Sequence, residues 1–166
     1  MIIVEDGTLV PMSNSFVTRA GYIGFAATNG ITVADDAQAD FDLIKAGQFI
    51  NSLEGKLRGE RIERDQAMAY PRKLLVINGF DWAEDEIPTP VIHAQLFLAL
   101  EIRSGSDPYN PTQTLPVIKE RVEGAVEVGY AQPTVTGARA QQSQATRLVN
   151  YLFKSSGLFS IEAIRR

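Results

Sequence analysis

The residue type best suited to proton transfer near neutral pH occurs once in the sequence, as His93. A histidine acts as a general base beside a nucleophile and an orienting acid. No Gly-X-Ser-X-Gly sequence supplies a serine nucleophile, and the chain has no cysteine. His93 also lies next to the apolar stripe of an expected helix. The pattern therefore favours a structural or interface histidine over a catalytic one, and it predicts a protein that is not an enzyme.

Two groups of carboxylates have the residue type that binds metal ions. Asp40 and Asp42 lie two residues apart on an expected helix, so they face different directions and are predicted to be surface side chains. The other group lies within residues 81–86 and lacks the alternating ligands and central glycine of a calcium loop. It is predicted to be a solvated, negative approach to a helix. No metal or other cofactor is expected at either group. The second group consists of Asp81, Glu84, Asp85 and Glu86.

Two glycine motifs are similar in form to ligand-binding loops. Gly55-Lys56 resembles the end of a phosphate loop, but the spacing is wrong and no serine or threonine follows the lysine. Gly21 and Gly24 have the spacing of a Gly-X-X-Gly clamp without its basic middle residues. Glycine inside a helix costs about 1 kcal/mol relative to alanine. Close packing of a neighbour on that helix face is therefore the favoured interpretation.

A basic block covers residues 56–73 and contains several arginines with a tyrosine among them. Arginines beside an aromatic ring can stack on single-stranded nucleic acid and neutralise it. They can equally form ion pairs with the acidic blocks of a neighbouring copy. A plain solvated face is the third possibility. The protein interface is favoured, and its candidate residues are Arg58, Arg61, Arg64, Tyr70 and Arg72.

Length and composition indicate one globular domain with arms. The chain has 166 residues, of which 45% are apolar and 22% charged. Its longest apolar runs are far shorter than the roughly 20 residues that cross a bilayer, and its acidic start does not resemble a signal peptide. No membrane partner is expected. The absence of cysteine is typical of a protein from a reducing compartment.

The net charge of −4 hides alternating blocks along the chain. Residues 1–55 carry −5, residues 56–73 carry +3, residues 74–110 carry −5 and residues 111–166 carry +3. A generic duplex-binding protein is usually basic overall. Alternating blocks are more typical of a protein that docks against copies of itself or against other proteins.

Apolar periodicity predicts a mainly α fold: a small helical bundle with an inserted β-hairpin and an extended C-terminal tail. Asn14 or Ser15 is expected to cap the first helix, and Asn78-Gly79 is a turn signal. The turn at Glu123-Gly124 predicts a hairpin at about 117–130. Residues 1–154 then form one domain, and residues 155–166 form a separate tail. The predicted helices are 16–27, 36–53, Pro88 or Pro90 to about 104, and 138–154.

Several strings resemble one protein family, in order, over roughly residues 2–153. The most specific is Asp65-Gln66-Ala67-Met68-Ala69-Tyr70-Pro71-Arg72. The family is that of the head–tail adaptors, or connectors, of tailed phages, which also carries the label DnaT-like single-stranded-DNA-binding. The other matching strings are Val4-Glu5-Asp6-Gly7, Asn14-Ser15-Phe16-Val17, Ile87-Pro88 and Glu127-Val128-Gly129-Tyr130-Ala131.

The resemblance implies a virion structural protein, made in the host cytoplasm and resident at the head–tail junction. It implies an oligomeric ring, expected to be dodecameric, between the portal protein and a tail protein such as a nozzle, tube or second adaptor. Genomic DNA would pass through the lumen without specific binding. Acidic side chains lining the channel would limit sticking of the phosphates.

The last twelve residues extend past the resemblance and contain more apolar groups than a solvated tail needs. We expect Gly157 to let this tail swing out and order on a portal groove. A tail folded back on its own core is the alternative. The predicted docking residues are Leu158, Phe159, Ile161, Ile164, Arg165 and Arg166.

Three functional classes follow from the sequence. A virion adaptor is favoured over a replication-type single-stranded-DNA-binding protein, and an unrecognised enzyme or general interaction domain is the third. Binding to single strands would weaken steeply with salt and depend on Arg58, Arg61 and Arg64.

Overall fold

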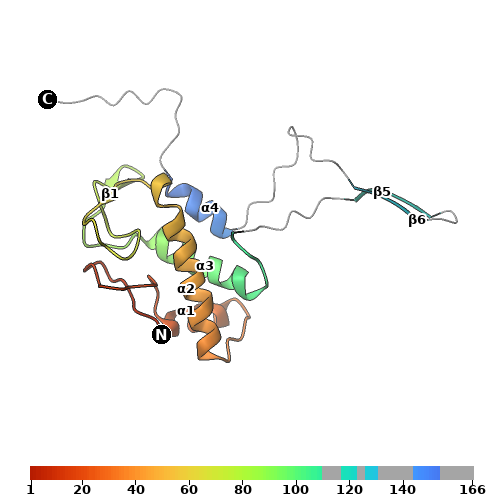
Figure 1. Cartoon of the computed structure of the whole chain (residues 1–166), viewed down its shortest axis with the longest axis horizontal. Helices are drawn as coiled ribbons and strands as arrows, with labels where there is room; N and C mark the ends of the chain where they lie inside the picture. The colour runs from red at the N-terminus through yellow and green to blue at the C-terminus, as the bar shows by residue number, and fades with distance from the viewer. Residues whose placement is uncertain (110–116, 123–125, 131–143, 154–166) are drawn as a thin grey trace, which may run out of the picture.

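The computed structural model describes residues 1–109, 117–122, 126–130 and 144–153. In this part of the chain four α-helices and three two-stranded antiparallel sheets form a mainly α protein, as predicted (Figure 1). No helix there is both long and apolar enough to span a membrane. The helices are α1 (Arg19–Thr28), α2 (Asp36–Ser52), α3 (Thr89–Arg103) and α4 (Gln144–Tyr151).

Helix α1 begins later than the sequence pattern predicts. Its N-cap is Thr18, whose hydroxyl accepts a hydrogen bond from the backbone N–H of Gly21. The predicted caps are wrong because both side chains are used elsewhere. The Asn14 side chain accepts from the N–H of Ile3, and the Ser15 hydroxyl donates to the carbonyl of Val17. Contacts with the N-terminal arm therefore displace the start of the helix.

The two longest helices confirm their sequence signals. Helix α2 covers Asp36–Ser52, with Asp35 as a cap that accepts from the N–H of Ala37 at 2.8 Å. Helix α3 starts at Thr89 with Pro90 in its first turn, where a missing N–H costs nothing. It ends at Arg103, next to the predicted stop at Ser104.

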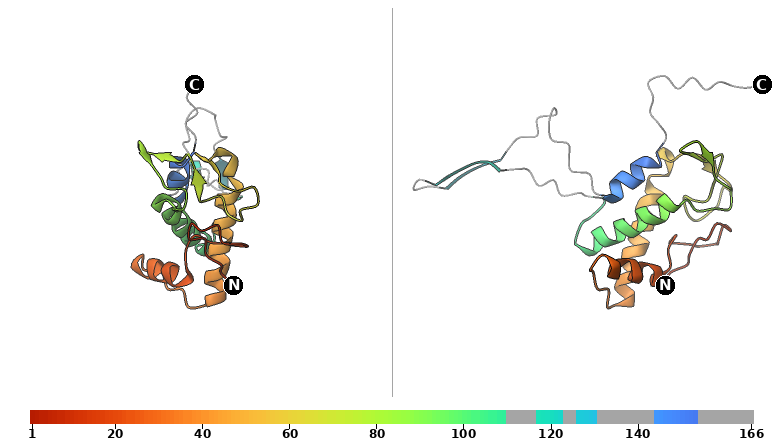
Figure 2. Two further views of the ribbon diagram at one scale, coloured as in Figure 1. Left: turned by 90° about the vertical axis from the view of Figure 1, so that its left-hand side faces the viewer. Right: turned by 180° about the vertical axis from the view of Figure 1, so that it is seen from behind.

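The core is built around α3, which packs against α2 and α4 and touches α1. In Figure 2, α4 runs beside α3. Helix α4 lies inside the predicted range 138–154. Its residues Ala145 and Val149 are buried as the 3.6-residue period requires, and so is Leu152 directly after it. Residues 138–143 of that prediction lie outside the described part of the chain.

A buried glutamine joins the N-terminal segment to two helices. Gln95 of α3 is fully buried and accepts from the N–H of Phe16 at 2.8 Å. Its amide nitrogen donates to Ser15 Oγ and to the carbonyl of Leu43, both at 2.9 Å. These bonds satisfy polar groups that would otherwise be costly to bury. Gly47 of α2 lies at the same junction, and an added Cβ there would be 2.8 Å from the carbonyl oxygen of Asn14.

Two glycine-to-alanine substitutions are expected to change stability in opposite directions. Gly47→Ala should lower the free energy of unfolding by about 1–3 kcal/mol, because the new methyl meets backbone. Gly24→Ala is the matched control, since nothing lies within 4 Å of its Cβ position in α1. It should raise stability by about 0.5–1 kcal/mol through helix propensity. Urea unfolding of the two variants measures both. A stabilised Gly47→Ala protein would contradict the close contact.

The expectation that Gly21 and Gly24 admit a closely packed neighbour is wrong. Gly24 faces open space, and the nearest atoms to a Cβ at Gly21 belong to Val17 and Thr18 of its own chain segment.

The segment between α2 and α3, which includes the basic block, is mostly loop. It opens with a 3-10 turn (Glu54–Lys56). Strand β1 (Glu60–Arg61) pairs with β2 (Arg72–Lys73), and β3 (Val76–Ile77) pairs with β4 (Phe80–Asp81). The turn between β3 and β4 is Asn78-Gly79, with φ of 54° and 81°. Positive φ at both positions is what a type I′ turn requires.

The predicted hairpin near the C-terminal end of the chain is confirmed in its strands. Strand β5 (Val117–Val122) pairs with β6 (Val126–Tyr130) in antiparallel register. Residues 155–166 lie outside the described residues. So do all six predicted docking residues in that tail, and their role stays a prediction.

Candidate interaction surfaces

A glutamate directly after α2 organises the basic block. Both carboxylate oxygens of Glu54 accept from Arg61, through Nε and, at 2.9 Å, through Nη2. The remaining Arg61 nitrogen donates to the carbonyls of Arg64 and Gln66 at 3.0 and 3.1 Å. The hydrogen bonds from Arg61 hold the pKa of Glu54 below its ordinary value, against an opposing effect of burial. This bidentate pair fixes the loop that follows α2.

Arg72 is buried rather than presented to a partner. Only 4% of it is exposed, and it donates to the carbonyls of Gly59 at 2.9 Å and Ala69 at 3.2 Å. It also lies 3.5 Å from Glu54. Its guanidinium is 5.9 Å from the ring centre of Tyr70, which is itself fully buried. Burial raises the pKa of the Tyr70 hydroxyl to about 12.

Arg58 ties the same loop to α4. Its Nε donates to the carbonyl of Phe153 at 2.7 Å, and its backbone N–H donates to the carbonyl of Leu152 at 3.0 Å. Among the five predicted interface residues, Arg64 alone is exposed. The other four make contacts within the chain that sequence analysis missed, although Glu54 lies only seven residues before Arg61. Contact of these residues with a neighbouring subunit stays a prediction.

The exterior of residues 1–109 and 144–153 is strongly acidic. It exposes eleven carboxylates and three cationic side chains. Four of the carboxylates are the predicted solvated cluster of residues 81–86. No three histidine, aspartate or glutamate residues are grouped there as a metal site requires. The exposed cations are Lys56, Arg64 and Arg147. The exposed acids are Asp6, Asp35, Asp36, Glu60, Glu63, Asp65, Asp81, Glu84, Asp85, Glu86 and Asp107.

The prediction that Asp40 and Asp42 are surface side chains is wrong, because both are buried. They do face different directions, and each direction meets a cation from another element. Asp40 accepts two hydrogen bonds from Arg19, which hold its pKa below the ordinary value, and it lies 3.2 Å from the N-terminal ammonium of Met1.

Asp42 is fully buried between three helices. It accepts from the Tyr22 hydroxyl of α1 at 3.0 Å and from Gln38 at 2.9 Å. It also forms an ion pair with Arg103 of α3, with Nε 3.5 Å from Oδ2. Burial, followed by the charge of Asp42, raises the pKa of Tyr22 above its ordinary value. This network links α1, α2 and α3 through charge.

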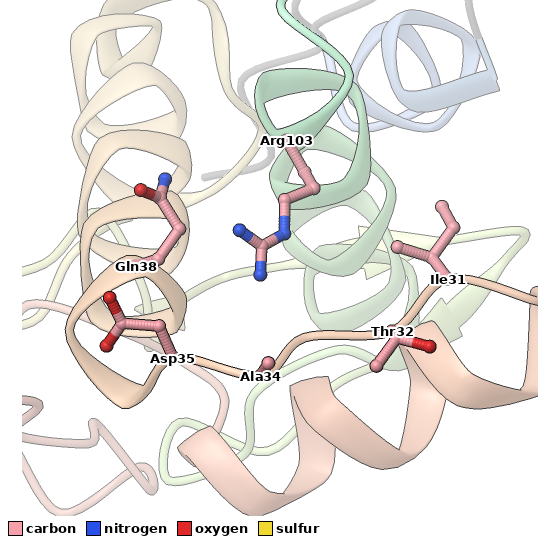
Figure 3. A pocket seen from close by; sticks show the side chains of 6 residues that line it. All are labelled: Ile31, Thr32, Ala34, Asp35, Gln38 and Arg103. Carbon is pink, nitrogen blue, oxygen red and sulfur yellow. The ribbon is translucent and has the colours of Figure 1, made fainter.

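A hollow of about 430 Å³ lies over this network (Figure 3). The Arg103 guanidinium points into it, toward the side of Gln38 and Asp35. Asp42 already neutralises this arginine, and Asp35 adds a negative charge, so the hollow has no net attraction for an anion. His93 lies elsewhere, exposed on α3. The one histidine is therefore not among the residues that line the hollow. The lining residues are Ile31, Thr32, Ala34, Asp35, Gln38 and Arg103.

The hairpin of β3 and β4, with the residues before it, exposes large apolar side chains. Leu74 is 72% exposed, Val76 44% and Phe80 74%. The alternate residues Leu75 and Ile77 are buried in the core. Because residues 74–77 are all apolar, the sequence pattern gives no sign of this two-residue alternation. Exposed apolar side chains that gather in one segment are typical of protein contact sites.

The described residues thus define a small, mainly helical protein with an acidic exterior and an exposed apolar hairpin. The family described as "Putative DnaT-like ssDNA binding protein" matches residues 1–166, and the chain belongs to this family. Neither the search of curated proteins nor the search of solved structures found a match to the chain.

Proposed function

We propose that this protein is a head–tail adaptor of a tailed phage. Its copies would form a ring, expected to be dodecameric, between the portal protein and the tail protein at the head–tail junction of the virion. The ring would line the channel for genomic DNA and perform no reaction. It would be made in the host cytoplasm and would need no cofactor or membrane.

The acidic exterior is the observation that carries this proposal. Phosphate contacts dominate the affinity of proteins for nucleic acids and depend on accessible lysine and arginine side chains. Here the arginines of the basic block are mostly held by Glu54 and by backbone carbonyls. An exterior with eleven exposed carboxylates and three exposed cations repels phosphate. That property suits a conduit that DNA must pass without being retained.

Binding to single-stranded DNA is the second candidate, and the family description favours it. Residues 1–109 and 144–153 offer three exposed cations for that role. Further cations on strand β5 and outside the described residues would have to supply most of the phosphate contacts. They are Lys119, Arg121, Arg139, Lys154, Arg165 and Arg166.

Two measurements separate these functions. We expect ring particles in electron micrographs of the protein mixed with its portal, and we expect the protein in purified virions. Titration of a labelled single-stranded oligonucleotide at low salt should show no binding. Absence from virions together with tight, salt-sensitive oligonucleotide binding would overturn the adaptor and support the second candidate.

The tail of residues 155–166 is proposed to dock on the portal. A chain truncated after Lys154 should keep the thermal unfolding of the full chain but fail to bind portal in a pull-down. Normal assembly of the truncated protein onto portals would contradict docking by Leu158, Phe159 and the other apolar residues of the tail.

A further inference from the structure

The backbone at Leu74 is strained, and the Leu74 side chain gains no burial from it. Its φ is 54°, in the left-handed region that branched side chains such as leucine rarely adopt. Strain of this kind persists where the surroundings impose it, and it often marks a functional position. Burial of the side chain does not offset the strain, because Leu74 is 72% exposed.

Leu74 begins a surface of mixed character that we name the apolar–acidic segment, residues 74–86. Val76 and Phe80 add exposed apolar area. The exposed carboxylates of the 81–86 cluster follow directly along the chain. A partner for this segment needs aromatic or apolar groups together with accessible cations.

The same chain carries such a surface on α4. Arg147 and Tyr151 are both exposed and lie four residues apart, so they share one side of the helix. At the C-terminal end of this helix, the ammonium of Lys56 is 5.9 Å from the ring centre of Phe153. Two of the three exposed cations of residues 1–109 and 144–153 thus border α4, and tyrosine and arginine are frequent contact residues at interfaces. We name this surface the α4 face.

The two surfaces lie on different sides of the core. In Figure 1 the loop segment that holds β1 to β4 lies to the left of the upper end of α2, and α4 lies to its right. The view from behind in Figure 2 shows the same separation. Two complementary surfaces at different positions on one subunit generate a heterologous, head-to-tail contact, which forms a ring when the rotation between copies closes.

We propose that the apolar–acidic segment of one copy docks on the α4 face of a second copy. Leu74, Val76 and Phe80 would pack on Tyr151 and Phe153, and the 81–86 carboxylates would face Lys56 and Arg147. Charge complementarity within this one chain favours a second copy over a different protein as the occupant. The inference rests on the proposed ring and assigns its subunit contact.

Because the chain has no cysteine, single cysteines can test this contact directly. Full-length Phe80→Cys and Tyr151→Cys proteins are mixed and treated with a short bismaleimide. The reaction is run on two samples of the mixture: the free proteins at high concentration, and the proteins bound to portal. A crosslinked product joining positions 80 and 151 is expected in the mixture and in neither protein alone. A dominant 80–80 product, a link from position 80 to portal, or no 80–151 product in either sample would overturn the contact. Rings that form on portal without this product would leave the proposed function standing, whereas a protein that binds no portal would contradict that function itself.

A second test uses the strain at Leu74. Asparagine tolerates the left-handed conformation better than leucine does, so Leu74→Asn should raise the melting temperature. The same change should weaken self-association about tenfold, as loss of a central contact residue does.

Met12→Asn is the matched control. Met12 is also exposed with φ of 58°, but it lies in the turn closed by the Ser13–Val10 hydrogen bond, outside the proposed contact. It should raise the melting temperature and leave association unchanged. If Leu74→Asn associates as tightly as the wild type in sedimentation velocity, the docking role is wrong.

Discussion

Replacing Asp42 with alanine is expected to lower the free energy of unfolding by about 3–5 kcal/mol. The carboxylate is fully buried and neutralises Arg103 while accepting from Tyr22 and Gln38. Its removal leaves a guanidinium whose Nε has no other partner among the described residues. It also leaves Tyr22 with only the longer bond to the Ala99 carbonyl, at 3.3 Å. Urea unfolding monitored by circular dichroism measures the loss.

Two further variants show whether the stability lost in Asp42→Ala comes from the buried network or only from the removal of a negative charge. Asp36→Ala removes an exposed partner of Arg19 and should cost less than about 1 kcal/mol. The double variant Asp42→Ala with Arg103→Met removes both members of the ion pair. It should regain about 1–2 kcal/mol relative to Asp42→Ala, because no guanidinium is left without its carboxylate. An Asp42→Ala protein as stable as Asp36→Ala would show that the network does not hold the helices together.

Local signals predicted those parts of the fold whose causes are local. The start of α2 at Asp36, the proline at the start of α3 and the Asn78-Gly79 turn each depend on a few neighbouring residues, and each was confirmed. The start of α1 was missed because the Asn14 side chain bonds Ile3 across a turn of the chain. The burial of Asp42 was missed because its partners come from other helices. Helical periodicity cannot report a cation that arrives from outside the helix.

In the candidate site, too, the sequence predicted local features and missed contacts with distant parts of the chain. The arginines of residues 58–72 were singled out correctly as unusual, since their chemistry and density are visible in the sequence. Their partners were not visible, because backbone carbonyls such as those of Phe153 and Gly59 carry no residue-type signal. Leu74 was missed for the opposite reason. A leucine in an apolar run suggests burial, and only the backbone conformation shows that its side chain leaves the core.

Replacing Glu54 with alanine is expected to lower the free energy of unfolding by about 2–4 kcal/mol at pH 7. Arg72 would stay buried without a carboxylate, and Arg61 would lose both of its ionic hydrogen bonds. Glu60→Ala is the matched control: it removes an exposed glutamate of the same loop and should change stability by no more than about 0.5 kcal/mol. Thermal and urea unfolding of both variants at pH 7 measure the difference.

The pH dependence of this loss identifies its cause. The pKa of Glu54 is lower in the folded chain than its ordinary value of 4.5. Its contribution to stability is therefore complete above about pH 4.5 and is lost as the pH falls through the folded pKa. The stability gap between wild type and Glu54→Ala should shrink from pH 7 to pH 3, while other carboxylates such as Asp40 affect both proteins equally. A gap that stays constant over this range would mean that side-chain packing, not the ionised carboxylate, stabilises the loop.

The Glu54→Ala variant also tests whether the arginines of the basic block stabilise their own loop or contact a neighbouring subunit. If its arginines mainly hold the loop, Glu54→Ala and Arg61→Ala should each speed hydrogen exchange over residues 57–73, and the double variant should add little, since the pair acts as one unit. Arg64→Ala should leave exchange unchanged, because Arg64 is exposed. If instead Arg61 serves mainly a neighbouring subunit, Arg61→Ala would weaken self-association while leaving exchange in the isolated chain as it was. The burial of Arg72 and the bidentate Glu54 pair support the first outcome, and they leave the subunit contact to Leu74, Phe80 and the α4 face.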